Sequence, residues 1–285
     1  MKQYKKKEAK KKSSKKNGSN YKKPPIPKGF FHVEGTWKTG FVIEHLDKFD
    51  RSQFVWVPVG ALKKNATLDG ITFLQRFGRR RFIPQDFWDN EYFEELVGEL
   101  KKQYKSVKKY GGFYISRFTI SKNKKTGRAQ SIEGEYPWVE MKYKKAKKIA
   151  QKMINKDHVK SHLLYGAEYD SVLQWFKQTK SRSMKEIVED SRTWGHYDEG
   201  CEALFGVARL KKTGVNKNTC TNGIYDFTGN VFTMTQERAK GGMRVLRGGG
   251  YEYGPCENAA ATRHKMEIGL IGGDEEGLRV ALWLA

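Results

Sequence analysis

The sequence predicts an α+β fold that is rich in loops, with few helices and short antiparallel strands. Three observations lead to this class. Aromatic-rich segments with alternating apolar residues occupy the first part, helical patterns with one apolar face follow, and the chain after residue 178 is almost entirely turn, loop and short strand. More than half of the 29 glycines lie in this last part. Because long loops in compact domains usually carry function, we expect the C-terminal half to present a functional surface.

The first residues differ in composition from the rest of the chain. Residues 1–23 contain eleven lysines and a single acid, Glu8, within a chain of formal net charge +23. Such a segment buries too little apolar surface to offset its conformational entropy, so residues 1–24 are expected to form a disordered, lysine-rich tail. The PPIP sequence at 24–27 stiffens the chain and marks the start of one domain, residues 25–285.

Two strands are expected before the middle of the chain. Residues 53–59 (QFVWVPV) alternate and are aromatic-rich, and Pro58 places this strand at a sheet edge or places the proline at a strand end. Residues 111–120 (GGFYISRFTI) form a second strand that follows a glycine turn.

Three helices are expected from apolar residues at helical spacing. The first lies within residues 89–109, where the apolar positions are Phe93, Leu96, Val97, Leu100 and Tyr104. The second covers residues 139–154, with lysines on its outer face and an inner face formed by Val139, Tyr143, Ala146, Ile149, Ala150 and Met153. The third covers about residues 166–178, and its buried side consists of Ala167, Tyr169, Val172, Leu173 and Phe176.

Turn residues and arginines organise the C-terminal half. Asn222-Gly223 and Gly229-Asn230 bracket an alternating stretch, which predicts a tight strand–turn–strand. Gly248 and Gly249, with the glycine that follows, let the backbone approach a ligand or another strand closely. Arg247 and Arg279 follow apolar strand residues, so we expect both to be buried against carboxylates or carbonyls and to pin loops.

Composition also bears on location. No apolar run approaches the ~20 residues of a transmembrane helix, and no hydrophobic segment follows the charged start, so neither a membrane span nor a Sec signal peptide is expected. The three cysteines (Cys201, Cys220, Cys256) are odd in number and far apart, which argues against a disulfide framework. The expected location is cytoplasmic at synthesis, with a virion or cell surface as the alternative destination.

Seven segments, in order, resemble the formylglycine-generating-enzyme (sulfatase-modifying factor) family. They are FVWVPVG (54–60), GGFYISRFTIS (111–121), PWVEMKYKKAKKIAQKM (137–153), LLYGAEYDSVLQWF (163–176), GIYDFTGNVFTMTQE (223–237), RVLRGGGY (244–251) and GLRVAL (277–282). The resemblance covers about residues 26–285 and implies the C-type-lectin-like fold of that family.

The resemblance breaks down at the copper site of the family's oxidases. Those enzymes share a pair of cysteines just after the Arg-Gly-Gly element, because two thiolates hold Cu(I) linearly. Tyr253 occupies the first position here, and Cys256 lies three residues too early for the second. Cys256 is therefore the one candidate for a catalytic cysteine, and an incidental thiol is the alternative interpretation.

Two further metal sites of the family are also altered. The iron-dependent relatives use a His-x3-His-x-Glu motif to bind the metal. His158 and His162 have the spacing of the two histidines, but Leu164 stands in place of the acid. Both histidines are therefore interpreted as loop or helix-end residues. The family's calcium site keeps Asn230, and Asp226 is a second calcium candidate, but a threonine replaces the nearby carboxylate. No cofactor is predicted, with calcium as the alternative.

These departures favour a non-catalytic ligand-binding protein rather than an enzyme. The C-terminal loops at about 247–280 combine aromatic faces with hydrogen-bonding ends, as recognition loops do. The candidate ligand-binding residues are Tyr251, Glu252, Tyr253, Asn258, Arg263, His264, Lys265, Glu267 and Asp274. The resemblance implies a setting too, since non-catalytic members of this fold include bacteriophage recognition proteins and variable proteins of diversity-generating retroelements. The expected partner is a protein or glycan on a cell or particle surface.

Two functions of other classes remain open. One is a copper-dependent oxidase of the formylglycine-generating type with a rearranged metal site. The other is a nucleic-acid or particle-assembly protein that works through the lysine tail, because each neutralised phosphate releases counterions. Removal of residues 1–23 and a steep salt dependence would distinguish the last function from ligand binding.

Overall fold

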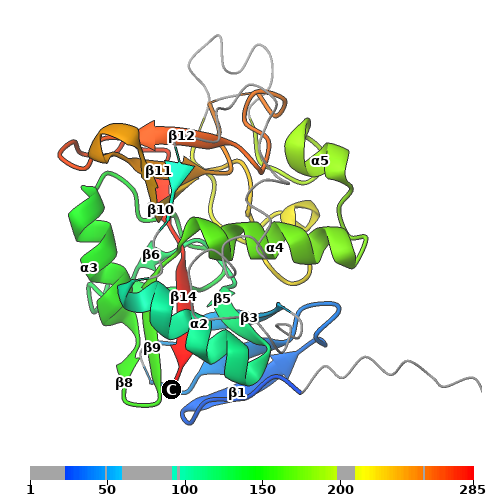
Figure 1. The fold of residues 1–285 in the computed structure, drawn as a ribbon, viewed down its shortest axis with the longest axis vertical. Helices are drawn as coiled ribbons and strands as arrows, with labels where there is room; N and C mark the ends of the chain where they lie inside the picture. Colours follow the sequence, from blue (N-terminus) through cyan, green and yellow to red (C-terminus); the bar gives the residue numbers. More distant parts are fainter. Residues whose placement is uncertain (1–22, 49, 60–91, 95–96, 198–208, 253) are drawn as a thin grey trace, which may run out of the picture.

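The computed structural model describes residues 23–48, 50–59, 92–94, 97–197, 209–252 and 254–285. Its largest sheet has seven strands in the order β1 (Phe30–Glu34), β2 (Val42–His45), β3 (Gln53–Pro58), β5 (Gly112–Ser116), β14 (Val280–Leu284), β9 (Val159–Leu163) and β8 (Asn155–Lys156). All pairings in this sheet are antiparallel. The last strand of the chain, β14, lies in the middle of the molecule (Figure 1).

A second sheet forms the upper part of the molecule (Figure 1). Its order is β12 (Arg263–Met266), β11 (Arg244–Arg247), β10 (Phe232–Ala239) and β13 (Glu276–Leu278), and β4 (Tyr92–Phe93) also pairs with β10. The β10–β13 pairing is parallel, so the expectation of antiparallel strands fails at this one described pairing. A small third sheet joins β6 (Ser121–Lys122) to β7 (Ala129–Gln130).

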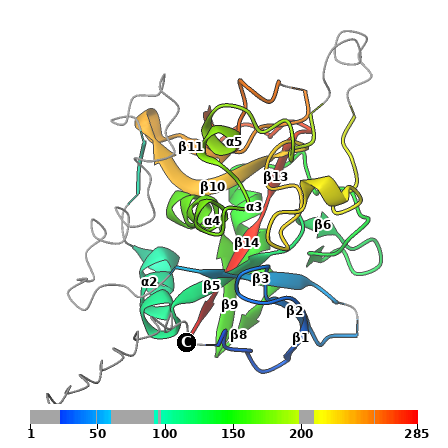
Figure 2. The same cartoon turned by 90° about the vertical axis from the view of Figure 1, so that its right-hand side faces the viewer.

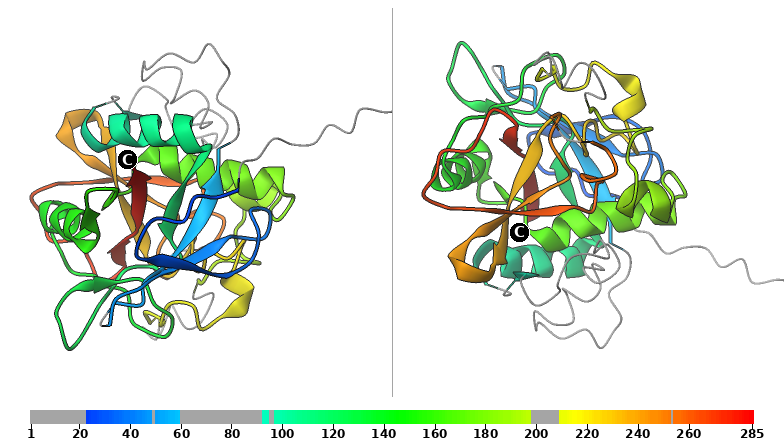
Figure 3. Two further views of the ribbon diagram at one scale, coloured as in Figure 1. Left: turned by 90° about the horizontal axis from the view of Figure 1, so that it is seen from below. Right: turned by 90° about the horizontal axis from the view of Figure 1, so that it is seen from above.

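The helices cover both faces of the seven-stranded sheet (Figure 2). On one face, α2 (Gly98–Tyr110) and α4 (Gly166–Gln178) pack over Val55, Val57 and Ile115. On the other face, α3 (Tyr143–Met153) packs over Phe54 and Trp56. Because successive strand residues point to opposite faces, β3 is buried on both sides, which explains its continuous apolar sequence. A short helix, α5 (Met184–Val188), follows at the far end of α4 (Figure 3), and its Ile187 carbonyl accepts from the amide of Ala261.

The α+β, loop-rich class is confirmed, and most expected elements are present with shifted bounds. The strand β3 and the helix α4 match their predicted ranges, and Pro58 ends β3 opposite Gly112. The helix α3 begins at Tyr143 rather than 139, because Glu140 has a positive φ of 55° and Lys142 forms a β-bridge with Ile271.

Two expectations need correction. The helix predicted within 89–109 begins at Gly98, and Phe93 belongs to strand β4. The Asn222-Gly223 turn is present, with φ of 48° and 79° and two backbone hydrogen bonds between Thr221 and Ile224, but it forms an isolated bridge rather than a pair of strands. The positive φ values are those of the two central residues of a type I′ turn. None of the described helices has the length and hydropathy of a membrane span.

Candidate functional site

A buried network of four charged side chains holds the C-terminal loops from below. The guanidinium of Arg247 donates to Asp170 at 2.6 Å and to Glu237 at 3.2 Å, and Arg263 donates to the same two carboxylates at 2.8 and 3.2 Å. The four side chains are at most 1% exposed. Asp170 comes from α4, Glu237 from β10, and the arginines from β11 and β12, so the network ties a helix to three strands.

The electrostatics of this network keep Arg263 charged. Burial alone would lower the pKa of Arg263, but Asp170 and Glu237 raise it above its ordinary value. Two positive and two negative groups leave no net buried charge, which is the arrangement in which a desolvated ion cluster is tolerated. The expectation that Arg247 is buried against carboxylates is therefore met by the structure.

Gly248 lies directly after this network and allows the chain to turn. Its φ is 86°, and a Cβ at this position would overlap the hydroxyl of Tyr169. Tyr169 lies under Arg247, with the guanidinium 4.4 Å from the ring centroid, and its hydroxyl donates to the carbonyl of Phe227 at 2.9 Å. Gly249 has a φ of 76° and would similarly overlap the backbone of Asn258. Both glycines are thus required by close packing as well as by backbone conformation.

Arg279 is buried among carbonyl groups. It donates to the backbone oxygens of Ser116 and Asp226 at 3.2 and 2.8 Å, to the carbonyl of Tyr225, and to the hydroxyl of Thr119. Burial lowers its pKa to about 10, although Asp226 and Tyr169 act in the opposite direction. This side chain joins β5 to the 225–226 loop, as the sequence predicts for a loop-pinning arginine.

The calcium candidates have protein partners instead. The Asp226 carboxylate accepts from the hydroxyls of Thr213 and Thr219 at 2.8 and 2.7 Å and from the Gly214 amide at 2.8 Å. The Asn230 side chain pairs with the backbone of Lys211 at both its oxygen and its nitrogen. These contacts hold both side chains in place within the protein. Among the described residues, no group of three or more His, Cys, Asp or Glu side chains has the geometry to hold a metal.

The sequence-predicted ligand residues divide into three groups. Glu252, Lys265, Glu267 and Asp274 are exposed, and His264 is half-buried. Tyr251, Asn258 and Arg263 are covered, at 2%, 2% and 1% exposure, so their assignment as surface ligand contacts is corrected. Arg263 belongs to the buried network, and Asn258 pairs with His264 at 2.7 Å. Tyr253 lies outside the described residues.

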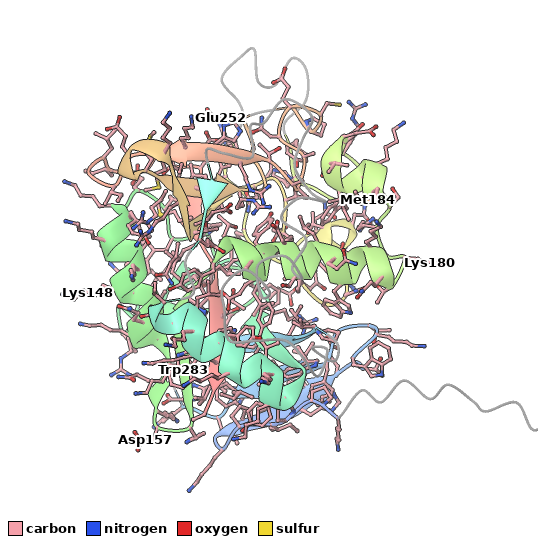
Figure 4. The ribbon with its side chains drawn as sticks, viewed as in Figure 1. Lys148, Asp157, Lys180, Met184, Glu252 and Trp283 are labelled. Atoms are coloured by element: carbon pink, nitrogen blue, oxygen red, sulfur yellow. The ribbon has the colours of Figure 1, made fainter. Side chains whose placement is uncertain are left out.

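An acidic surface forms where Glu252 meets the segment 274–276. Its members are Glu252, Asp274, Glu275 and Glu276, and we call this set the acidic surface (Figure 4 labels Glu252 at the top of the molecule). Burial raises the pKa of Glu275 to about 7, and the charges of Glu252, Asp274 and Glu276 add to the effect. Burial likewise raises the pKa of Glu276. The chain thus collects negative charge here despite its net positive charge.

Two glycines and a tyrosine shape the acidic surface. A Cβ at Gly250 would overlap the Glu275 carboxylate, and a Cβ at Gly272 would overlap that of Glu276. The Tyr251 hydroxyl donates to Asp274 at 2.9 Å, and its covered position and this carboxylate raise the pKa of Tyr251. The GGDEEG sequence at 272–277 was the available signal for Glu275 and Glu276, which the sequence-based residue set omits. Leu270 and Ile271, at 60% and 65% exposure, precede it in the same loop.

The cysteines and histidines that the structure describes do not converge on one site. Cys256 is exposed and Cys220 is half-buried, and both are free thiols; Cys201 lies outside the described residues. Burial raises the pKa of Cys220. His162 is in strand β9 rather than in a loop or helix end, where its Nε2 lies 2.9 Å from the buried Glu168 carboxylate. His158 instead bonds to the carbonyl of Lys28, so the two histidines have separate partners.

The fold and the site define an α+β protein that presents polar, acidic loops from a rigid sheet and helix scaffold. No protein-family model and no curated protein sequence matches the chain. Three similar solved structures are PvdO from Pseudomonas aeruginosa (17% identity, 61% of this chain and 82% of that chain, TM-score 0.41), CarF (14%, 61% and 87%, 0.43) and Treponema denticola variable protein 1 (14%, 89% and 93%, 0.29). At these values the function rests on this chain's own residues.

Proposed function

We propose that the protein is a non-catalytic recognition protein whose C-terminal loops bind a ligand at the acidic surface. The observation that carries this proposal is the contrast between the buried ion network of the site and the exposed loop residues above it. Below, the Arg247–Asp170–Arg263–Glu237 network is fully buried and joins four elements. Above, Glu252 and Asp274 are exposed on loops that this network anchors. A surface fixed in advance loses less conformational entropy on binding, which favours recognition.

The charge of the surface indicates the chemistry of the ligand. Glu275 sits among three other carboxylates, and its Oε2 has no hydrogen-bond partner in the described part of the chain. A lysine or arginine of a ligand would relieve this repulsion and donate to the carboxylates. Leu270 and Ile271 add exposed aliphatic area in the same loop. These features favour a basic protein segment over a neutral glycan as the ligand.

The biological setting is part of the same proposal. Non-catalytic members of the family that the sequence resembles bind targets at cell or particle surfaces, in phages and in retroelement-associated variable proteins. The exposed, polar residues of the 247–280 loops are compatible with that role. The proposed location is therefore a virion or cell surface.

Binding of a peptide array tests the proposal directly. The triple variant Glu252→Gln, Asp274→Asn, Glu275→Gln removes three charges from the acidic surface, and the matched control Glu133→Gln, Asp157→Asn, Glu189→Gln removes three exposed charges elsewhere. We expect wild type and the control to bind lysine- and arginine-rich peptides, and the site variant to bind them about tenfold more weakly. Equal binding by both variants, or binding of acidic peptides alone, contradicts the proposal.

A second candidate function is supported by the lysines of the helices. The helix α3 carries Lys144, Lys145, Lys147, Lys148 and Lys152 and no acid, and Figure 4 shows Lys148 at the outer edge of the molecule. A basic helix face attracts nucleic acid or another polyanion. A salt titration with duplex DNA distinguishes this function, because phosphate contacts make the affinity fall steeply with salt. An affinity that does not change with salt excludes it.

A further inference from the structure

A cavity of about 540 Å³ lies outside the acidic surface and shares no lining residue with it. Figure 4 labels Asp157, the neighbour of its wall residue Lys156, at the bottom of the molecule, and Glu252 at the top. The cavity is lined by the end of β2, the turn at 127–129, the C-terminal part of α3 and β8, and it is open to solvent. Its volume is in the range of small-molecule sites.

One wall of the cavity carries a histidine–aspartate pair. His45 is 4% exposed, and its Nδ1 lies 3.2 Å from Asp50 Oδ2. Asp50 also accepts from the Ser52 amide at 3.0 Å. Burial works against ionisation of Asp50, but the hydrogen bonds from His45 and Ser52 prevail and lower its pKa, so it is ionised at neutral pH.

This pairing fixes what the other ring nitrogen of His45 can do. Because an ionised carboxylate only accepts hydrogen bonds, His45 Nδ1 carries a proton and donates it to Asp50, which leaves Nε2 as the ring atom that can pair with a ligand. Within the residues that the structure describes, Nε2 is buried and has no hydrogen-bond partner. A buried polar atom without a partner is costly, and a hydroxyl group of a ligand, which can donate or accept, would satisfy it.

The other walls supply an apolar surface and positive charge. Trp138, Ile149, Met153 and Ile154 form the apolar part, and the indole ring is half-buried. Arg128, Lys152 and Lys156 are exposed at the cavity and outnumber its two acids, Asp47 and Asp50. An aromatic wall, a single orienting ring nitrogen and a cationic rim are complementary to a ring that carries a hydroxyl group at one end and an anion at the other.

We infer that this cavity is a second binding site, for a small anionic molecule with an apolar ring and a hydroxyl group. The hydroxyl pairs with His45 Nε2, the ring contacts Trp138 and Met153, and the anionic group pairs with Lys152 or Lys156. The site is independent of the acidic surface, since the two share no residue and prefer ligands of opposite charge.

Three related probes separate the proposed contacts. 4-Hydroxyphenylacetate has the ring, the hydroxyl and the anion; phenylacetate lacks the hydroxyl, and tyramine replaces the anion with an ammonium group. For ligands of this size a dissociation constant on the order of millimolar is expected, which ligand-observed NMR detects with the full chain. We expect 4-hydroxyphenylacetate to bind about fivefold more tightly than phenylacetate and tyramine.

Variants then locate the binding. Lys152→Glu is expected to weaken 4-hydroxyphenylacetate about fivefold, whereas Lys148→Glu, an equal charge change on the same helix but outside the cavity, should leave its affinity within twofold of wild type. His45→Gln should abolish the preference for the hydroxylated probe while phenylacetate still binds. Lack of binding by wild type at about 10 mM, tighter binding of tyramine, or equal loss in Lys148→Glu and Lys152→Glu overturns the inference. Because Lys152 is exposed, its variant tests the site even if the buried His45→Gln fails to fold.

Discussion

Replacing Glu237 with glutamine measures how strongly the buried ion network stabilises the protein. The substitution keeps the size of the side chain but removes one of two negative charges. Glu237 accepts from Arg247 and Arg263, each at 3.2 Å, and all three side chains are at most 1% exposed. The variant therefore leaves two buried guanidinium groups that share the single carboxylate of Asp170.

The expected loss is large because no water can take over the lost contacts. Removing one partner from a buried ion pair typically costs about 3–5 kcal/mol of unfolding free energy. For a domain of this size, about 2–4 °C of melting temperature corresponds to each kcal/mol, so the midpoint should fall by about 10 °C. The matched control is Glu135→Gln, which removes a half-buried carboxylate at the surface, 4.0 Å from Lys124, and should change the stability by less than about 1 kcal/mol.

Chemical denaturation followed by circular dichroism compares the two variants with wild type. A loss of less than about 1 kcal/mol in Glu237→Gln, no greater than in Glu135→Gln, would refute the claim that the network anchors the loops. Hydrogen exchange supplies a second readout, because the amides of β11 and β12 should lose protection in Glu237→Gln and keep it in the control.

Three further outcomes are expected. Gly248→Ala should destabilise the protein by about 1–3 kcal/mol in a denaturation assay, because of its positive φ and its contact with Tyr169, and an unchanged midpoint would contradict this. The pKa of Glu275 is raised to about 7 from its ordinary value of 4.5, so the folded state loses stability as the pH rises from about 4.5 to 7. The variant Glu275→Gln should therefore raise the melting temperature at about pH 8 and leave it unchanged at about pH 4. A variant that is equally stabilised at both pH values would show that the charge is not the cause. Iodoacetamide should alkylate the exposed Cys256 before Cys220, because burial raises the pKa of the Cys220 thiol. Peptide mapping by mass spectrometry measures the order, and alkylation of Cys220 first would be inconsistent with the described exposures.

Local patterns in the sequence predict the bounds of helices and strands that are buried on most of their surface. The helix α4 has buried residues on most of its surface and matches its predicted range, 166–178. The start of α3 could not be predicted in this way, because the β-bridge between Lys142 and Ile271 comes from a distant loop. Phe93 fits a helical spacing but pairs with Arg238 of β10, a long-range contact that overrides the local pattern.

Some features of the candidate site also follow from the local sequence, whereas others depend on residues that are far away in the chain. The need of Arg247 and Arg279 for buried partners follows from their position after apolar strand residues, and the structure supplies carboxylates to one and carbonyls to the other. The identity of the partners does not follow, since Arg247 and Asp170 are 77 residues apart. Arg263 looked like a surface contact because its loop is polar, whereas its register opposite Arg247 places it in the network.

The central position of β14 also constrains when the protein can fold during synthesis. Residues 280–284 lie between β5 and β9, and each of these strands is synthesised more than a hundred residues earlier. Until this segment has left the ribosome, the two flanking strands expose unpaired backbone edges, which are prone to aggregation. Nascent chains of this protein should therefore need protection by a chaperone until residues 280–284 have left the ribosome.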